Sequence, residues 1–454
     1  MTDIIALLAC LDQCVDKTTV RQLHRIIVAM LTMTGRVTML GLSRWTEKGG
    51  SYRTIQRWFG KSLPWLQMSW LFLRHHLLKR DAEYLLAGDE TVVTKAGKQT
   101  HGLDRFFSSI YGKPVAGLSF FALSLVSLQE RKSYPLLVEQ RVRSDEEKAA
   151  TRKQAKGKKQ AKSKKPAASK PKRGRPKGSK NKDKTQVAWT PELRFVEGLL
   201  QKAMPLVTGF CSVSYLVLDG HFGNNHALQM VLHATSLHLV SKLRNNAALY
   251  FVYDGEQKQC GPRRRYGAKL DYQAIPEKYR KATYQEDKMQ TDIYQAPLLH
   301  KCFAVPLNVV IIVKTNRGSG ARGHVVLFSD DLDLAYDKLI DYYQLRFQIE
   351  FNFRDAKQFW GLEDFMNIQA APVINAVNLS FFMVNVSHVL LQQLRQTDTD
   401  VGILDLKSFY RGRRYAIETL NLLPEPPSSF LSDQIVRIVT ALGSIHRRSA
   451  ALKT

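Results

Sequence analysis

The sequence predicts a mixed α/β fold in which a helical N-terminal segment precedes a sheet of short strands. Three observations support this class. Up to about residue 80, apolar side chains recur at spacings of three and four, the period of an amphipathic helix. From Tyr84 onward, short apolar runs replace that period, as expected for buried strands. The chain has 454 residues, of which 44% are hydrophobic, so it is long enough to bury a large core and to hold several domains.

The order of the predicted elements narrows the fold further. Three adjacent strands come first, and helices and strands then alternate, over residues 84–88, 115–128, 134–143, 193–207, 213–218, 225–235 and 237–243. This is the order of an RNase H-like sheet. A β-rich segment follows, and residues 334–360 contain neither Gly nor Pro, which suits one long helix buried on most sides. Within it, apolar and polar residues alternate over 345–353 as in a strand, so the pattern alone leaves both structures open.

The net charge of +27, from 67 Lys and Arg against 40 Asp and Glu, points to a polyanionic partner. A membrane is excluded as that partner because the longest apolar stretch, 370–391, contains a Pro, three Asn and a His. Nucleic acid is the expected partner. The chain has no G-x-x-x-x-G-K-[ST] motif, so we expect no nucleotide cofactor.

Much of the positive charge lies in one arm, predicted to be disordered over 146–186. Residues 148–184 contain 17 Lys or Arg and a single acid, and have no apolar period with which to form a core. The Gly-Arg-Pro core around Arg173 and Arg175 resembles an AT-hook, which inserts into the narrow minor groove of A·T-rich DNA. A nonspecific basic tether is the alternative, and both would bind phosphates.

A second DNA-binding candidate lies in the N-terminal segment. A Gly-Gly break is followed by Ser51, a suitable helix cap, and then by a basic amphipathic turn. Arg53 and Arg57 are four residues apart and would share the exposed face, as in a helix-turn-helix. The alternative is an ordinary helical bundle with a solvated basic face.

Three acids are the candidate catalytic residues. Asp89 and Asp219 each follow a predicted strand, although an Asp in that position is also common as a turn or cap residue. Glu350 lies on the predicted helix in one stripe with Tyr343, Arg346 and Lys357. The alternative for that stripe is a structural row of salt bridges, which would include Arg354.

The spacing Y-x2-R-x3-E-x6-K resembles bacterial insertion-sequence DDE transposases with the Y-R-E-K signature. Gly88-Asp89-Glu90-Thr91 and Leu218-Asp219-Gly220 add to the resemblance, which covers residues 80–390. It implies that Asp89, Asp219 and Glu350 hold two Mg²⁺ or Mn²⁺ ions per active site, as suits an all-carboxylate ligand set.

The resemblance also implies partners and further residue roles. Arg346 and Lys357 would contact DNA phosphates, with Arg354 beside them, and Tyr343 would contact the same strand. The DNA would be double-stranded: the terminal inverted repeats of a transposable element and a target. The enzyme would act as a homodimer in a paired-end complex, in the cytoplasm and associated with the bacterial nucleoid.

The expected organisation has five parts: a helical DNA-binding domain (1–80), the first part of the catalytic domain (81–245), a β-rich insertion (246–333), the catalytic helix and end of that domain (334–390), and a helical C-terminal region (391–454). The expected function is metal-dependent cleavage at transposon ends and strand transfer, that is, DNA recombination. The alternatives are a transposase-derived DNA-binding protein without catalysis and an RNase H-like nuclease without strand transfer.

Overall fold

The computed structural model describes residues 3–46, 49–108, 111–149, 183–396, 400–425 and 427–446. Arg173 and Arg175, with most of the predicted arm, lie outside the described residues. The described ends of that arm correct the prediction of disorder over 146–186. Residues 145–149 are helical, because Ser144 and Glu147 cap each other's backbone amides, and Lys184 Nζ donates to two oxygens of the body of the protein.

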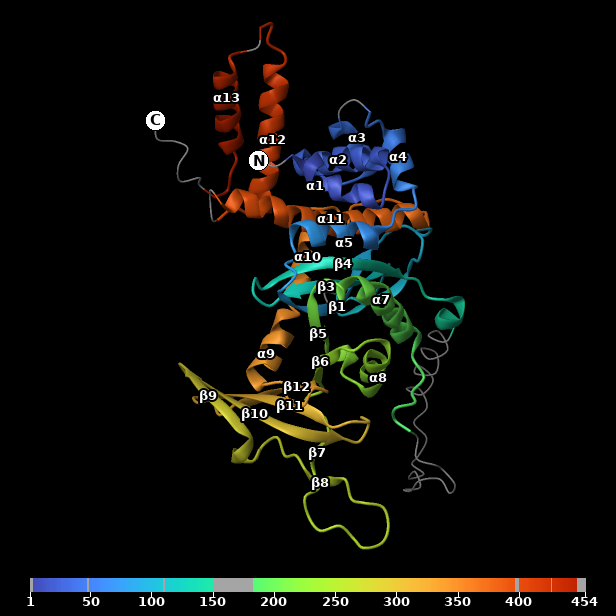
Figure 1. The fold of residues 1–454 in the computed structure, drawn as a ribbon, viewed down its shortest axis with the longest axis vertical. Helices are drawn as coiled ribbons and strands as arrows, with labels where there is room; N and C mark the ends of the chain where they lie inside the picture. Colours follow the sequence, from blue (N-terminus) through green and yellow to red (C-terminus); the bar gives the residue numbers. More distant parts are fainter. Residues whose placement is uncertain are drawn as a thin grey trace.

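The N-terminal segment is helical, as predicted, and forms a small bundle at one end of the molecule (Figure 1). The helices α1 to α4 each begin where a side chain accepts a hydrogen bond from a free backbone amide; the Asp16 carboxylate and the Ser51 hydroxyl serve α2 and α4 in this way. The elements are α1 (Ile4–Leu8), η1 (Ala9–Gln13), α2 (Lys17–Thr32), α3 (Met39–Trp45), α4 (Tyr52–Phe59) and α5 (Trp65–His76).

The centre of the protein is a mixed sheet whose first five strands in space run β4, β3, β1, β5, β6. The pairs β4–β3 and β3–β1 are antiparallel, whereas β1, β5 and β6 are parallel. This RNase H-like arrangement confirms the predicted fold class. The strands are β1 (Glu83–Thr94), β2 (Asp104–Ser108), β3 (Lys113–Ser127), β4 (Lys132–Arg141), β5 (Ser212–Leu218) and β6 (His238–Leu243).

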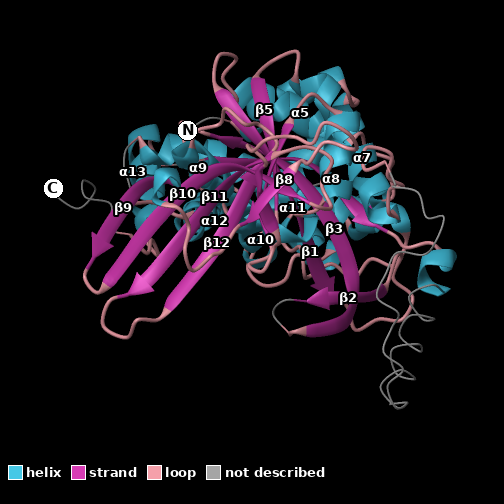
Figure 2. Ribbon diagram, turned by 90° about the horizontal axis from the view of Figure 1, so that it is seen from below, coloured by secondary structure: helices cyan, strands magenta, loops and turns pink. Residues whose placement is uncertain are grey.

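The strands after β6 continue the same sheet. β12 pairs with β6, and β11, β10, β7 and β8 follow in order, with β9 on the side of β10. Figure 2 shows these strands spreading away from the helices as a broad blade. Their bounds are β7 (Leu249–Val252), β8 (Tyr266–Lys269), β9 (Arg280–Glu286), β10 (Met289–His300), β11 (Leu307–Asn316) and β12 (Arg322–Ser329), with η3 (Glu277–Tyr279) before β9.

Helices cover both faces of the parallel strands. The helix α9 (Tyr336–Leu345) packs on one face, and α7 (Pro191–Val207) and α8 (Asn225–Ala234) lie on the other (Figure 1). Parallel strands need such cover because both of their faces are apolar. The short η2 (Gly220–Phe222) joins β5 to α8, and α10 (Gln348–Gln358) continues from α9 toward β4 and β1.

The C-terminal third contains three long helices, α11 (Ala370–Arg395), α12 (Ile403–Leu420) and α13 (Ser429–Ala441). α11 is long and apolar enough to span a membrane, but 89% of its apolar window is buried inside the protein. It is therefore a core helix, and its buried Asn375, Ser380 and Asn385 donate hydrogen bonds to backbone carbonyl oxygens. α12 and α13 form a hairpin that projects beside the N-terminal bundle (Figure 1).

Asn375 fastens the N-terminal bundle to α11. Its side chain is buried, accepts from Trp65 Nε1 at 2.7 Å, and donates to the carbonyl oxygens of Phe59 and Lys61 at 2.7 and 2.8 Å. A buried amide with three partners is costly to disturb, because each partner left alone is desolvated and unpaired. The bundle is thus held firmly on the core helix.

A second junction links the bundle to the segment that follows α10. Asp364 accepts a hydrogen bond from the backbone amide of Val37 at 2.9 Å. Gly361 has φ of +78°, and a Cβ at this position would lie 2.4 Å from Val37 Cβ. Only glycine satisfies both the backbone conformation and the close approach.

Candidate active site

Asp89 and Asp219 lie next to each other where strands β1 and β5 part. The parallel pairing ends at Gly88 opposite Leu218, and each Asp is the next residue of its strand. Gly88 permits this close packing, because a Cβ there would lie 2.8 Å from Leu218 Cδ2. The two carboxylates therefore leave the sheet from neighbouring positions.

Both side chains point to the face that α9 and α10 cover. Side chains alternate along a strand, so Asp89 shares a face with Leu85 and Ala87, and Asp219 shares one with Val217. Those three apolar residues pack in one cluster with the buried side chains of α9. The strand alternation thus directs both acids toward the helix that carries Glu350.

The structure corrects the predicted position of Asp89 within its strand. β1 does not stop before Asp89 but continues to Thr94, because the antiparallel pairing with β3 extends through Asp89 opposite Ala122. Asp219 does end its strand, as predicted, and its carboxylate accepts a hydrogen bond from the His221 amide at 3.1 Å. At Asp89, β1 therefore loses its pairing with β5 but keeps its pairing with β3.

The predicted helix over 334–360 is two helices, which is a second correction. α9 ends at Leu345 and α10 begins at Gln348, with a tight turn in which the Ile349 amide donates to the Arg346 carbonyl at 3.0 Å. The expectation of burial on most sides is also wrong, since Phe347 is 50% exposed. Backbone angles at the turn stay in the right-handed helical region, so the predicted stripe is kept in register.

Arg346 joins two of the three acids. Its Nη1 donates to Asp89 Oδ2 at 2.5 Å, and its Nη2 donates to Glu350 Oε1 at 3.2 Å. The guanidinium also lies near the ring of Tyr343, with its carbon 5.9 Å from the ring centroid. The first contact spans 257 residues of sequence, so the structure brings together Asp89, Tyr343, Arg346 and Glu350.

Asp219 and Glu350 are close enough to Asp89 to affect its ionisation. The pKa of Asp89 is raised to about 6, mainly by burial; the charges of Asp219 and Glu350 contribute to the rise, whereas Arg346 lowers the pKa. Without another cation, a desolvated cluster of like charges favours the protonated acid. The site therefore concentrates negative charge that one arginine only partly offsets.

The donor set fits a hard divalent cation, because all three acids offer carboxylate oxygens. Among the described residues no three His, Cys, Asp or Glu side chains are arranged as a ready-made metal site. The position of Arg346 accounts for this, since its guanidinium occupies the space between Asp89 and Glu350. The ligand types required for metal binding are present, with the arginine in place of a cation.

The other predicted residues of the helix stripe separate into two groups. Lys357 lies over β1, where its Nζ donates to the Val92 carbonyl at 3.3 Å and pairs with Glu363 at 3.4 Å. Arg354 is turned away and pairs with Asp355 at 2.9 Å, so the alternative row of salt bridges contains the Arg346–Glu350 pair and does not continue to Arg354. Lys357 belongs to the rim of the site and Arg354 does not.

The predicted DNA-binding arginines of the N-terminal segment are exposed. Arg53 and Arg57 lie on the outer face of α4, opposite its buried Ile55, Trp58 and Phe59. This face is far from the acids along the chain and belongs to a different element. Within the part of the chain that the structure describes, no hydrogen bond or ion pair joins Arg53 or Arg57 to Asp89, Asp219 or Glu350.

The structure adds Glu192, which the sequence did not indicate, as the partner of His221 beside Asp219. His221 Nε2 lies 3.1 Å from Glu192 Oε2, and Glu192 also pairs with Arg141 Nη1 at 3.0 Å. The hydrogen bond to Glu192 raises the pKa of His221, with further contributions from Asp219 and Glu90. No sequence signal pointed to Glu192, because an acid in the first turn of a helix is common for electrostatic reasons alone.

Comparison with known proteins identifies the family. A family model described as DDE superfamily endonuclease matches residues 10–297, which include Asp89 and Asp219. No curated protein matches the chain. Enzymes of this superfamily cleave nucleic acid, act on DNA and generally use divalent metals. The chain, with its RNase H-like sheet and paired aspartates, is a member of the DDE superfamily endonuclease family.

Proposed function

We propose that the protein is a DNA transposase that cleaves DNA at the ends of a transposable element and joins those ends to a target. The observation that carries the proposal is the convergence of Asp89, Asp219 and Glu350 on one face of the sheet, around Arg346. Carboxylates from two neighbouring strands and a helix suit phosphoryl transfer, which needs positioning and charge stabilisation more than covalent chemistry.

In this proposal Asp89, Asp219 and Glu350 hold two Mg²⁺ or Mn²⁺ ions. Such ions, when bound, activate the attacking oxygen and stabilise the leaving oxygen of an in-line displacement at phosphorus. Arg346 then changes partner, from the carboxylates to a phosphate of the DNA, since a guanidinium matches both geometrically. Tyr343 orients Arg346 and contacts the DNA strand that carries this phosphate.

The rest of the chain holds the DNA. Lys357 contacts a phosphate at the rim of the site, and Arg53 and Arg57 bind the terminal repeat through α4. Arg173 and Arg175 add affinity from the basic arm. Two ends must be joined together, so we propose that the protein acts as a homodimer in the paired-end complex, in the bacterial cytoplasm. The proposed domains and segments are residues 1–80, 81–245, 246–333, 334–390 and 391–454.

Strand transfer in solution tests the proposal. Wild-type protein and the Glu350→Gln variant are incubated with Mg²⁺ or Mn²⁺, a supercoiled target, and labelled DNA carrying the element's own ends. Glu350→Gln keeps the size of the side chain and its hydrogen-bonding oxygen but removes the charge. Glu286→Gln, an exposed position on β9, is the matched control.

Three results are distinguishable. If wild type and the control join ends to target while Glu350→Gln binds but does not, the proposal stands. If wild type nicks the ends and never joins them, the protein is a nuclease without strand transfer. If wild type binds the ends and neither cuts nor joins with either metal, it is a DNA-binding protein without catalysis.

A further inference from the structure

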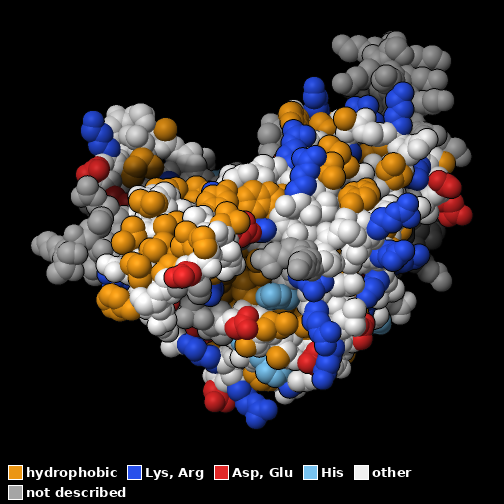
Figure 3. Space-filling view, turned by 90° about the horizontal axis from the view of Figure 1, so that it is seen from above, with side chains coloured by type: hydrophobic (Ala, Val, Ile, Leu, Met, Phe, Trp, Pro, Cys, Tyr) orange, Lys and Arg blue, Asp and Glu red, His pale blue; other side chains and the backbone are white. Residues whose placement is uncertain are grey.

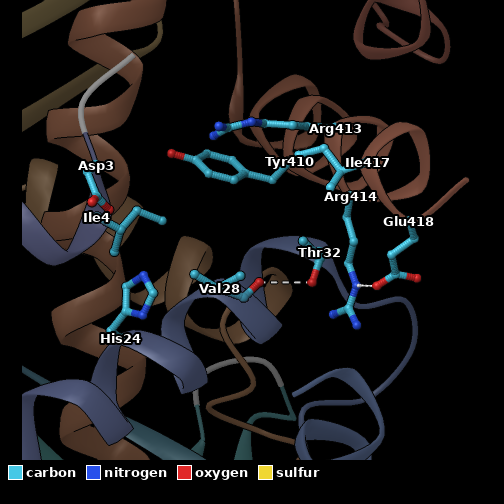
Figure 4. A pocket seen from close by; sticks show the side chains of 10 residues that line it. All are labelled: Asp3, Ile4, His24, Val28, Thr32, Tyr410, Arg413, Arg414, Ile417 and Glu418. Atoms are coloured by element: carbon cyan, nitrogen blue, oxygen red, sulfur yellow. Dashed lines mark hydrogen bonds and ion pairs between the residues drawn. The ribbon is translucent and has the colours of Figure 1, made fainter. Parts of the chain in front are cut away.

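A groove runs between the N-terminal bundle and α12, far from the acids in the fold. Two adjoining cavities of about 400 and 810 Å³ form it, and they share His24, Val28 and Arg414. Figure 3 shows the molecule hollowed between a part rich in hydrophobic side chains and a part where Lys and Arg gather. Figure 4 shows that α1 and α2 line one wall and α12 lines the other.

The lining of the groove is basic. On α2, Lys17, Arg21 and Arg25 are spaced four residues apart and all three are exposed, so they form one stripe along the helix. Arg21 and Arg25 line the groove, and α12 contributes Arg413 and Arg414 from the opposite wall. Four arginines on two facing helices make an anion-binding surface.

Few acids offset this charge. Asp3 and Glu418 are the acids of the lining, and Glu418 is held by Arg414, with Nε to Oε1 at 2.6 Å. Arg21, Arg25 and Arg413 are exposed. The lining of the groove therefore carries a surplus of positive charge that solvent and ligands can reach.

The groove opens onto the turn that precedes α4. Trp45 and Thr46, which end α3, are part of its lining. Arg25 Nη1 donates to the Gly49 carbonyl at 3.3 Å, and Arg414 donates to the Trp45 carbonyl and lies over its ring, 5.4 Å from the centroid. A polyanion bound along the exposed face of α4 could therefore continue past this turn into the groove.

We propose that this groove binds the sugar–phosphate backbone of DNA beside the segment contacted by α4. Arginine is suited to this because its planar donors match phosphate oxygens in pairs. The inference rests on the proposed function, since it takes DNA as the substrate. It assigns a DNA-binding role to α12, so that both ends of the chain hold the same duplex.

The dependence of DNA affinity on salt concentration measures how many phosphates the groove contacts. Each phosphate contact contributes about 0.9 to the fall of log K with log salt concentration on duplex DNA. Replacing Arg21, Arg25 and Arg413 together with Gln should therefore reduce the slope by about 2.7 if each binds one phosphate. Binding of the element's ends is measured in EDTA, so that cleavage does not interfere.

A matched control removes the same charge elsewhere. Arg80→Gln, Arg194→Gln and Lys338→Gln change three exposed cations outside the groove lining. A far-UV circular dichroism spectrum and a urea-unfolding midpoint equal to those of wild type show that the groove variant is folded.

The outcomes separate this inference from the proposed function. A slope reduced by two or more only in the groove variant, with a shorter protected stretch in hydroxyl-radical footprints, supports the groove. If wild type binds and cuts the ends while both triple variants have the same slope, the groove assignment is wrong and the proposed function stands. If wild type neither prefers nor cuts the ends, the proposed function itself fails.

Discussion

Replacing Asp89 with Asn should stabilise the metal-free protein at neutral pH. The pKa of Asp89 is raised mainly by burial, from an ordinary value of 3.8 to about 6. Each pKa unit corresponds to about 1.4 kcal/mol, so ionising this carboxyl in the folded protein costs about 3 kcal/mol more than in the unfolded chain. Asn has a similar shape and cannot ionise, so the variant avoids that cost.

The sign of the pH dependence follows from proton binding. Between pH 3.8 and about 6 the folded protein keeps the Asp89 proton, whereas the unfolded chain has lost it. The folded state then binds more protons, so this group's contribution to stability falls as pH rises through that window and is constant above it. The stability of Asp89→Asn relative to wild type should therefore increase by about 2 kcal/mol from pH 4 to pH 7, since part of the change already lies below pH 4.

Urea unfolding at pH 4, 5, 6 and 7, in EDTA, measures this difference. Asp145→Asn, which changes a fully exposed carboxyl, is the control and should show no comparable change with pH. A difference between Asp89→Asn and wild type that stays constant over the range, or shrinks toward pH 7, would refute the reasoning. Such a result would mean that Arg346 offsets the full cost of burying the charge.

Three further substitutions probe how the parts are joined. Asn375→Ala should cost about 3 kcal/mol in urea unfolding, because it leaves Trp65 Nε1 and two carbonyls buried without partners; an Asn375→Asp variant that unfolds like wild type would argue against this. Gly361→Ala should lower stability by more than 1 kcal/mol through positive φ and contact with Val37, and a Tm equal to wild type would contradict the clash. Asp405→Ala should cost about 2 kcal/mol, because the buried carboxylate accepts hydrogen bonds from the backbone amides of Gly402, before α12, and Ile445, after α13. Amide hydrogen exchange should then be faster in the α12–α13 hairpin and unchanged elsewhere. Unchanged protection in the hairpin would exclude this role.

Much of the fold could be predicted because its helices and strands have a clear periodicity of apolar residues in the local sequence. The change from helical spacing to short apolar runs near Tyr84 marks the start of the sheet, and the order of elements identifies it as RNase H-like. β2 was not predicted, because a five-residue edge strand has too few residues to show a period. The length of β1 was underestimated, since Asp89 and Glu90 look like a turn and only the pairing with β3 keeps them extended.

The candidate site was predicted in part, for a similar reason. The spacing of Tyr343, Arg346 and Glu350 follows from the helix, and is visible in sequence. The break after α9 has no Gly or Pro to mark it. The contacts of Arg346 with Asp89 and of His221 with Glu192 depend on tertiary packing, so no local pattern could reveal them.

If α4 recognises DNA and the Glu350 helix α10 takes part in cleavage, as proposed above, then the attachment of both elements to α11 fixes the distance between the two events. α4 is fastened at Asn375, and α10 packs at Phe381, where the ring of Phe353 lies 5.9 Å away. These points are six residues apart on one helix, about 9 Å at 1.5 Å per residue. A base pair inserted between the recognised sequence and the cleaved end would shift the scissile phosphate by about 3.4 Å and turn it by about 34°. We therefore expect the cleaved phosphodiester bond to be set by its distance from the sequence that α4 binds, and not by the bases at the cut.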